Sequence, residues 1–499
     1  MNIVTLFESR YPSDPSRTFI ETASGHIYSY SNLEAASARI ANFLINIGVN
    51  KGDRVVVQVD KSPEVLFLYL ATLRMGAIYL PLNTAYTDRE LNYFLVDASP
   101  VLLVCRPEQV SSAQALATKN NIDHCLTLGK SANGSLLAGA ADCSAEFKTV
   151  ECDDDDIAVI LYTSGTTGQP KGAMISHGNL AANGLTLHKF WQWRPGDILL
   201  HVLPIFHIHG LFVACHCVLL NGSKMLFLEK FDVMSVMENL PRSTVMMGVP
   251  TFYVRLLANK ALTRERCKNM RLFICGSAPL PEHTFNEFLA LTGHTILERY
   301  GMTETGMNTS NPVDGKRLPG TVGLALPGVS VRIVDNELND LPANEIGNLL
   351  VKGNNVFRGY WNMPEKTKEE FTDEGDFRTG DLARMDKNGY VSIVGRSKDL
   401  IISGGLNVYP KEIEYEIDQL EAVTESAVIG LPHVDFGEAV TAIIVLEKDS
   451  TLKAQEIMDH LDTCLANFKL PKRIYFVDSL PRNTMGKVQK NILRQQFTE

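Results

Sequence analysis

The segment YTSGTTGQPKG, residues 162–172, combines three glycines, four serine and threonine hydroxyls, a proline and a lysine. It directly follows the apolar run Ile157–Leu161. Glycine lets backbone N–H groups approach a ligand closely, hydroxyls donate hydrogen bonds, and lysine adds positive charge, so this composition indicates a phosphate-binding loop. The spacing differs from a P-loop, because Pro170 precedes Lys171 and no serine or threonine follows the lysine. We therefore expect nucleotide chemistry other than transfer of the γ-phosphate.

Composition favours an intracellular enzyme of several domains. The chain has 499 residues, of which 45% are hydrophobic and 21% charged, and this length predicts roughly two to four domains. The net charge of −10 argues against a nucleic-acid partner. The nine cysteines are scattered without a CxxC pair, which is typical of free thiols in a reducing compartment. No secretion signal and no apolar run of roughly 18–20 residues are evident, so we expect a cytoplasmic protein without a membrane partner.

The order of the segments predicts an α/β fold. Over about 300 residues, short apolar runs alternate with amphipathic stretches, which favours mainly parallel sheets in two doubly wound subdomains. The sequence pattern then changes to brief strands separated by turn residues. The strands VSVRIVD, GNLLVKG and GYVSIVG indicate a small β-rich subdomain. After GRSKDLIISGG the pattern becomes α+β. We place a domain boundary at Lys398, with residues 1–397 forming the N-terminal domain and residues 398–499 a smaller, mobile C-terminal domain. The acidic run Asp153–Asp156 reads as a turn before a buried strand.

Four further segments carry chemistry. They are YGMTET (300–305), TGD (379–381), GRSKD (395–399) and PRNTMGK (481–487). Each alone is a weak signal, because an aspartate after glycine is usually a turn residue. Together with residues 162–172, in this order and spacing, they make the chain resemble the adenylate-forming superfamily of acyl-CoA synthetases, luciferases and peptide-synthetase adenylation domains.

The resemblance implies an enzyme in which a carboxylate attacks the α-phosphorus of ATP and pyrophosphate leaves. Such a step depends on positioning and charge neutralisation. Tyr300 would stack on adenine, Asp381 and Arg396 would contact the ribose, Thr303 would contact the α-phosphate, and Glu304 would ligate Mg²⁺. The phosphate-binding loop implied by the resemblance comprises Thr163, Ser164, Gly165, Thr166, Thr167, Gly168 and Lys171.

The resemblance also makes Lys487 the catalytic lysine, which bridges the substrate carboxylate and the nucleotide. Lys398 would be the hinge about which the C-terminal domain turns. In a second orientation, Gly404 and Gly405 would form the passage for coenzyme A. Because PRNTMGK also fits a pattern found in acetylated synthetases, we expect Lys487 to be a target of a lysine acetyltransferase and its deacetylase.

The acid substrate depends on the segments LPIFHIHG (203–210) and GVPTFYVR (248–255). The resemblance puts His207 at the position that gates the acyl pocket. Arg255 lies three residues after Phe252, so we expect the two on one helical face, with Thr251 as the N-cap. An arginine on an apolar face needs an anionic partner. A structural salt bridge or a surface arginine is one interpretation, and a fork that holds a substrate carboxylate is the other.

A closer resemblance favours the second interpretation. GVPTFYVRLL, CGSAPLP, ILERYGMTETGMNTSNP, PGTVGLALPGV and LPRNTMGKVQK are very similar to malonyl-CoA synthetases. In that family the residues equivalent to Arg255 and Ser277 bind the distal carboxylate of malonate, and Met302 belongs to the same substrate site. The implied reaction is malonate + ATP + CoA → malonyl-CoA + AMP + pyrophosphate. Gly306 would leave room for an α-substituent, so we expect methylmalonate as a weaker substrate.

Three alternatives stay open from the sequence. The chain could activate another short acid such as acetate, propionate or succinate. It could instead be a stand-alone adenylation enzyme that loads a carrier protein, although only 12 residues follow Lys487 (499 minus 487). A non-enzymatic binding protein is the third alternative, and the set of Lys487, Glu304 and Asp381 argues against it.

Overall fold

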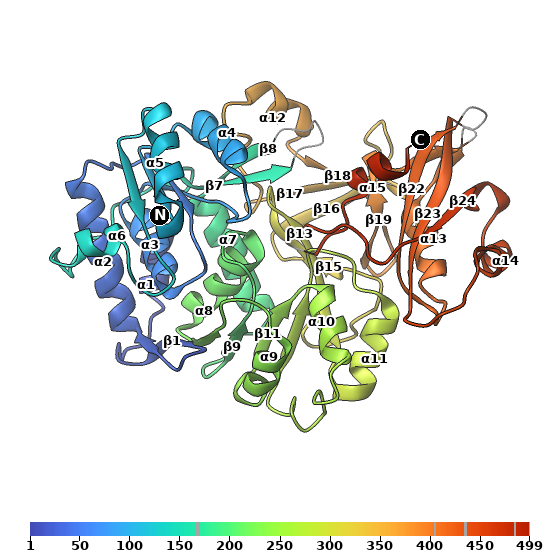
Figure 1. Cartoon of the computed structure of the whole chain (residues 1–499), viewed down its shortest axis with the longest axis horizontal. Coiled ribbons are helices and arrows are strands. Elements are labelled where there is room, and N and C mark those ends of the chain that lie inside the picture. Colours follow the sequence, from blue (N-terminus) through green and yellow to red (C-terminus); the bar gives the residue numbers. More distant parts are fainter. Residues whose placement is uncertain (165–169, 404–405, 434–436, 484–485, 499) are drawn as a thin grey trace.

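Four sheets organise the protein, which was analysed as a computed structural model describing residues 1–164, 170–403, 406–433, 437–483 and 486–498 (Figure 1). The largest sheet has nine strands in the order β15 (Leu324–Ala325), β14 (Gly306–Ser310), β13 (Ile296–Met302), β12 (Leu272–Cys275), β11 (Val245–Gly248), β9 (Ile198–His201), β10 (Lys224–Phe227), β1 (Thr18–Thr22), β2 (Ile27–Ser29). The second has six, in the order β6 (His124–Thr127), β5 (Leu102–Cys105), β3 (Arg54–Gln58), β4 (Ile78–Pro81), β7 (Ile157–Ser164), β8 (Pro170–Ser176). Most neighbouring strands in both sheets are parallel, and the hairpin β7–β8 is antiparallel.

Helices cover and separate these two sheets. They are α1 (Ile3–Glu8), α2 (Tyr30–Asn46), α3 (Pro63–Arg74), α4 (Asp88–Ala98), α5 (Val110–Lys119), α6 (Ser135–Ala140), α7 (His177–Phe190), α8 (His216–Asn221), α9 (Val233–Asn239), α10 (Pro250–Leu257), α11 (Glu282–Thr292). Every residue of α3 is buried, as expected for a helix that is apolar on nearly all sides. One apolar core contains α3 together with residues of both sheets, among them Val55, Val57, Leu199 and Met247. The two sheets therefore form one folding unit. Cys215 and Cys217 lie in this core.

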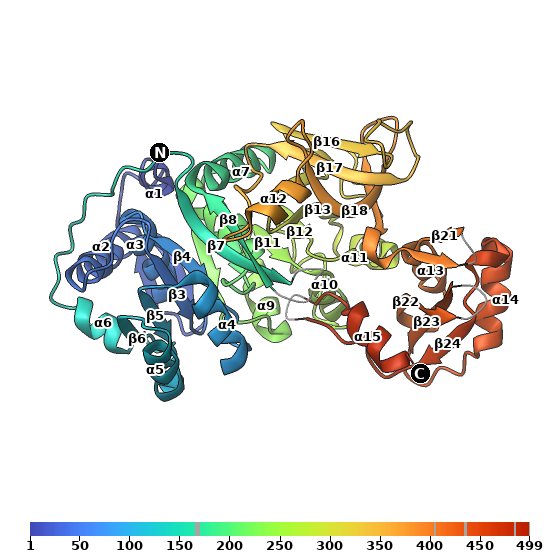
Figure 2. The same ribbon diagram turned by 90° about the horizontal axis from the view of Figure 1, so that it is seen from above.

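A small antiparallel sheet follows, in the order β16 (Val329–Val334), β17 (Gly347–Gly353), β18 (Phe377–Met385), β19 (Val391–Arg396), with α12 (Pro364–Glu370) between β17 and β18. The remaining residues form a separate C-terminal sheet of β21 (Leu406–Val408), β20 (Ile401–Ser403), β23 (Gly437–Leu446), β22 (Val423–His433) and β24 (Arg473–Phe476). Its helices are α13 (Pro410–Ile417), α14 (Ala454–Cys464) and α15 (Lys490–Phe497). Figure 2 shows this orange and red unit at one end of the molecule.

The predicted fold class is confirmed: a large α/β part and a β-rich subdomain precede a smaller α+β unit. The apolar clusters of the C-terminal unit contain only residues from Ile401 onward, so it has a core of its own. Lys398 lies in the short turn Ser397–Asp399 between β19 and β20, and the predicted boundary there stays a prediction. Among the described residues, no helix has both the length and the apolar character required to cross a membrane.

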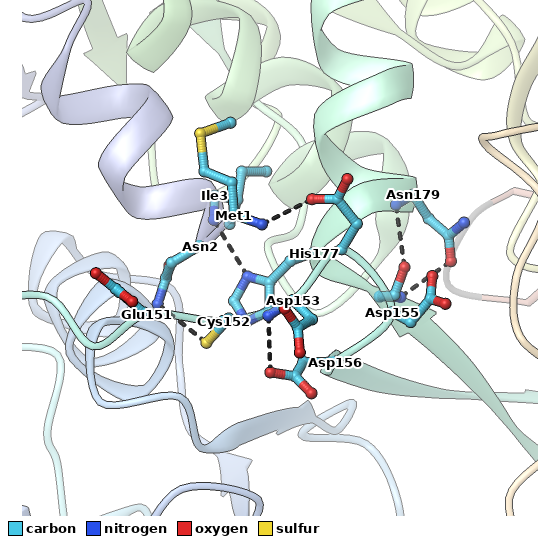
Figure 3. Close-up of polar contacts among 12 residues, drawn as sticks. Met1, Asn2, Ile3, Glu151, Cys152, Asp153, Asp155, Asp156, His177 and Asn179 are labelled. Carbon is cyan, nitrogen blue, oxygen red and sulfur yellow. Dashed lines mark hydrogen bonds and ion pairs between the residues drawn. The ribbon is translucent and has the colours of Figure 1, made fainter.

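The acidic run Asp153–Asp156 is a turn before β7, as predicted. Three of its carboxylates pair with cations from distant segments: Asp154 with the amino group of Met1, Asp155 with Arg358, Asp156 with Lys51. Beside this turn, the backbone N–H of Ile3 donates to Nδ1 of the buried His177 over 3.2 Å (Figure 3). The turn therefore ties the start of the chain to the first residue of α7.

Candidate active site

Loops that follow four parallel strands start at one edge of the nine-stranded sheet. β9 ends at His201, β11 at Gly248, β12 at Cys275 and β13 at Met302. In open α/β sheets, ligands bind outside the carboxyl ends of the strands. The fold therefore brings the segments that carry the four predicted substrate residues to one edge.

The predicted ribose ligands lie together on the small sheet. Asp381 on β18 pairs across the ladder with Arg396 on β19, and its Oδ1 is 2.6 Å from the Arg396 Nε. The hydroxyl of Tyr300, at the end of β13, donates to the other carboxylate oxygen of Asp381. Asp381 is almost fully buried, at 3% exposure. The carboxylate is therefore held rigidly where β13 meets the small sheet.

Glu304, the predicted Mg²⁺ ligand, is buried in the turn that follows β13. Its Oε1 accepts hydrogen bonds from the hydroxyls of Tyr360, at 3.1 Å, and Thr163, at 3.5 Å. Burial raises the pKa of Glu304, and Tyr360 and Arg396 compensate only in part. A hard divalent cation fits this site, because a carboxylate beside a threonine hydroxyl offers the oxygen donors that Mg²⁺ prefers.

Lys171, predicted to contact phosphate, is engaged by protein groups. Its Nζ lies 3.4 Å from Oε1 of Glu370 on α12 and 4.0 Å from the centre of the Tyr360 ring. A phosphate that approaches Lys171 therefore competes with the Glu370 carboxylate. Thr163 and Ser164 end β7 at this place, whereas the predicted loop residues Gly165, Thr166, Thr167 and Gly168 lie outside the described residues, as do Gly404 and Gly405.

Lys487 reaches the nucleotide side from the C-terminal unit. A Cβ built on the neighbouring Gly486 would lie 3.3 Å from the Thr251 Oγ1, so Gly486 lies against the start of α10. Lys487 keeps access to solvent, yet burial and the charge of Arg396 lower its pKa to about 8, partly opposed by Asp381. The protein thus brings Lys487 close to the predicted ribose residues.

A buried arginine that the sequence analysis missed lies on the acyl side. Arg299 on β13 is 3% exposed and makes no ion pair with any residue that the structure describes, and its Nε and Nη2 have no hydrogen-bond partner there. Its guanidinium lies against the backbone of Gly276, where an added Cβ would come within 2.5 Å of Cζ. Burial lowers the pKa of Arg299 to about 10, so the guanidinium remains charged at neutral pH. A buried cation without a partner is costly and calls for an anionic ligand.

Predicted substrate residues surround this cation. Burial, followed by the charge of Arg299, lowers the pKa of His207 to about 4 and that of His209 well below its ordinary value, so both rings are neutral. His209 Nδ1 lies 3.3 Å from the Ser277 Oγ, and its Nε2 is buried without a partner among the described residues. Ser277 has a φ of 72°, a strained conformation for a non-glycine residue that is often found at functional sites. Met302 and Thr303, at the end of β13, are half-buried.

Arg255 does not have the environment that the sequence predicts. It is exposed, and no hydrogen bond or ion pair links it to a described residue. The buried face of α10 runs through Tyr253 and Leu256, which leaves Arg255 on the solvent side. The expected N-cap is also wrong, because α10 begins at Pro250 and Val249 is its N-cap. Arg255 as a ligand of the acid thus stays a prediction without the burial on which it depended.

The space expected at Gly306 is filled. Its φ of 60° favours glycine, and a Cβ there would lie 2.7 Å from the Asn183 Oδ1. Asn183 is fixed by hydrogen bonds to both the N–H and the carbonyl of Met307. Gly306 therefore serves a tight turn, and Asn183 occupies the space that a side chain at this position would take. Methylmalonate as a weaker substrate stays a prediction that Gly306 does not support.

Two signals could have revealed Arg299 in the sequence. It stands in the apolar run that becomes β13, directly before Tyr300, and CGS (275–277) offers a glycine at the end of a neighbouring strand. The adjacent Glu298 suggests a surface ion pair, but successive residues of a strand point to opposite faces. Tyr360 has no motif of its own, and only the fold brings it to Glu304.

Comparison with known proteins fits this geometry. A model of the AMP-binding enzyme family matches residues 7–361, and a model of the AMP-binding enzyme C-terminal domain matches residues 412–487. The chain belongs to the AMP-binding enzyme family. Among curated members, the malonate–CoA ligase of Arabidopsis thaliana is 35% identical over 95% of this chain and 85% of the relative. The mitochondrial malonate–CoA ligase of Mus musculus is 38% identical over 95% and 87%, respectively.

A solved family member is more similar. The crystal structure of ATP-bound MatB from Rhodopseudomonas palustris is 54% identical and superposes with a TM-score of 0.97, covering 100% of this chain and 99% of that one. The TM-score against apo MatB from the same organism is lower, 0.86, at the same identity and coverage. The fold and the arrangement of its parts thus agree better with the ATP-bound family member.

Proposed function

We propose that this enzyme is an AMP-forming malonate–CoA ligase, which joins malonate to coenzyme A through a malonyl-adenylate. The observation that carries the proposal is the buried, unpaired Arg299 beside His209 and Ser277. An acid with one carboxylate would leave this cation unpaired once that carboxylate reacts, whereas a dicarboxylate supplies a second anion. The names of the plant and mouse relatives support the choice of malonate.

In the first half-reaction, a malonate oxygen bonds to the α-phosphorus of ATP and the bond from phosphorus to the pyrophosphate oxygen breaks. In our proposal Arg299 and Ser277 hold the distal carboxylate, while Lys487 lies between the reacting carboxylate and the nucleotide and balances the charge that develops. Asp381 and Arg396 orient the ribose, and Tyr300 contacts adenine. Glu304 would hold Mg²⁺, which supplies positive charge to the phosphate oxygens when bound.

In the second half-reaction, the coenzyme A sulfur bonds to the acyl carbon, AMP leaves with the electron pair, and the thiol proton passes to solvent. We propose that residues 398–499 turn about Lys398 between the two steps, which withdraws Lys487. The closer agreement with ATP-bound than with apo MatB supports a movement of this kind in the family. Freezing the hinge with Lys398→Pro should impair at least one half-reaction. Rates equal to those of wild type in both half-reactions would count against the movement.

Three finer predictions belong to the same proposal: methylmalonate as a weaker substrate, a cytoplasmic location, and acetylation of Lys487. A lysine acetyltransferase would abolish adenylation, because it removes the charge of the side chain. Incubation with such an enzyme, followed by peptide mass spectrometry, tests the last prediction.

The decisive experiment combines purified enzyme, ATP, Mg²⁺, coenzyme A and one acid from a panel of malonate, methylmalonate, succinate, acetate, propionate and ferulate. Ferulate is included because feruloyl-CoA synthase of an Amycolatopsis species is 34% identical over 95% of this chain and 94% of that one. Mass spectrometry should detect malonyl-CoA as the main thioester, with matching release of pyrophosphate. A monocarboxylic acid as the best substrate would overturn the proposal.

A further inference from the structure

The C-terminal unit carries a cluster of side chains that the proposed reaction does not use. Glu416 on α13 and His460 and Cys464 on α14 each offer one ligand atom, and these three atoms lie within 4.8 Å of one another. His460 and Cys464 are four residues apart on one helix, so their side chains share a face. From this geometry we propose a binding site for a thiolate-preferring divalent cation, Zn²⁺, that bridges α13 and α14.

The separation of the His460 and Cys464 ligand atoms is close to that in zinc sites. His460 Nε2 and Cys464 Sγ are 3.9 Å apart. A tetrahedral zinc with bonds of about 2.0 Å to nitrogen and about 2.3 Å to sulfur would hold these atoms about 3.5 Å apart. A shift of a few tenths of an ångström in flexible side chains therefore completes the two bonds.

The donor atoms of His460 and Cys464 contact backbone carbonyl oxygens, which a bound cation would displace. His460 Nε2 lies 3.2 Å from the carbonyl oxygen of Glu416, and Cys464 Sγ lies 3.2 Å from the carbonyl oxygen of its own helical turn, at His460. The Glu416 carboxylate forms no ion pair with any described residue. Cys464 is exposed and the other two are half-buried, so a cation can enter and water can take the fourth position.

The donor set selects the class of ion. One thiolate, one imidazole and one carboxylate favour Zn²⁺ over Mg²⁺ or Ca²⁺, which prefer oxygen ligands. Binding would release the Cys464 thiol proton to solvent, and the imidazole proton of His460 would move from Nε2 to Nδ1. The bond from Nε2 to the metal thus replaces its hydrogen bond to the Glu416 carbonyl. Figure 1 shows α14 at the outer edge of the C-terminal unit, away from β13 and β18, so this site is separate from the active site.

The bound cation should affect the stability of the C-terminal unit. α13 and α14 pack on the same C-terminal core through Ile413, Ile417, Ile457 and Leu461. A cation bound to both helices would stabilise the folded C-terminal unit, because ligands that bind only the native state raise its stability.

The test uses tag-free enzyme and Co²⁺, a spectroscopic substitute for Zn²⁺. Titration should give one equivalent of bound Co²⁺, a thiolate-to-cobalt band in the near ultraviolet and tetrahedral bands in the visible, all displaced by Zn²⁺. Cys464→Ser should abolish the thiolate band, and His460→Gln and Glu416→Gln should each weaken affinity by at least tenfold. The matched control is Cys143→Ser, which removes another partly accessible thiol.

A second measurement follows unfolding. Zn²⁺ should raise the thermal midpoint of wild type and of the Cys143→Ser control, and should leave that of Cys464→Ser unchanged. Absence of the thiolate band in wild type would overturn the proposal, as would a band that survives in Cys464→Ser. Malonyl-CoA synthesis should be equal in all these variants, so failure of the metal site and failure of the proposed function are distinguishable.

Discussion

Replacing Arg299 with methionine should lower catalytic efficiency with malonate and raise the stability of the free enzyme. Without ligand, the guanidinium is buried and unpaired, and burial lowers its pKa from 12.5 to about 10. At about 1.4 kcal/mol per tenfold change in protonation, the charge costs the free protein about 3 kcal/mol. Methionine fills a similar volume and removes that cost. Urea unfolding of the ligand-free variant should therefore show a higher midpoint than wild type.

The effect on activity has the opposite sign. Removing one partner of a buried ion pair costs about 3–5 kcal/mol. With about 1.4 kcal/mol per factor of ten, kcat/KM for malonate should fall by roughly two to four orders of magnitude. Arg299→Lys keeps the charge but loses the planar fork, so it should recover only part of the activity. Propionate offers no second carboxylate, and its kcat/KM should not fall in Arg299→Met.

The matched control is Arg255→Met, which removes an exposed arginine from α10. If Arg299 holds the distal carboxylate, the control should keep malonate kinetics within a few-fold of wild type. Malonate-dependent pyrophosphate release, measured over a range of malonate concentrations, reports both variants. Near-normal kcat/KM in Arg299→Met would refute the reasoning, and a large loss in Arg255→Met would restore the assignment that the sequence suggests.

Three further predictions concern the other charged groups. Burial and the charge of Arg396 lower the pKa of Lys487 to about 8. The rate of malonate-dependent ATP–pyrophosphate exchange should therefore be constant below pH 8 and fall up to tenfold per pH unit above it. A rate that rises above pH 8 would contradict a role for the Lys487 ammonium. Asp381→Asn should raise KM for ATP by about 10–100-fold, equivalent to about 1.5–3 kcal/mol for a charged hydrogen bond, with KM for malonate little changed; equal effects on both would indicate general misfolding. Burial raises the pKa of Glu298 from 4.5 to about 8, so the native state favours the protonated acid and its contribution to stability declines from pH 4.5 to about 8. At pH 8, the free energy of unfolding in urea should therefore be higher for Glu298→Gln than for wild type, by at most about 5 kcal/mol. This difference should vanish near pH 4.5. A difference that does not change with pH would argue against titration of Glu298.

Much of the fold follows from local patterns. The alternation of apolar and amphipathic segments predicted the α/β layers. Helices α3 and α13 both begin at a proline, a residue that favours the first turn of a helix. Asp381 and Arg396 were predicted as ribose ligands by resemblance. That they pair across β18 and β19 depends on strand register, which the sequence does not state.

The errors concern residues whose surroundings depend on the rotation of a helix about its axis or on the burial of a strand. Residues three apart on a helix differ by about 60° in direction, so Arg255 can leave the face on which Phe252 packs. Phe252 stacks on Phe231, with ring centres 4.0 Å apart, while Arg255 points to solvent. Arg299 was overlooked because it follows Glu298 directly, and two adjacent charged residues indicate a surface position. Only the structure shows that this part of β13 is buried.

The charged groups of the site fall into two classes, and the division explains how binding and activity are linked. Asp381 and Arg396 satisfy each other before any ligand arrives, so they supply a rigid frame. Arg299, Glu304 and Lys487 each hold a charge that the free protein destabilises, since burial lowers the pKa of both cations and raises that of the carboxylate. A distal carboxylate, a divalent cation and the reacting anions carry the charges that relieve these three costs. Binding of all substrates would therefore stabilise the folded protein relative to the free enzyme. This gain favours a dicarboxylate over any acid that leaves Arg299 unpaired.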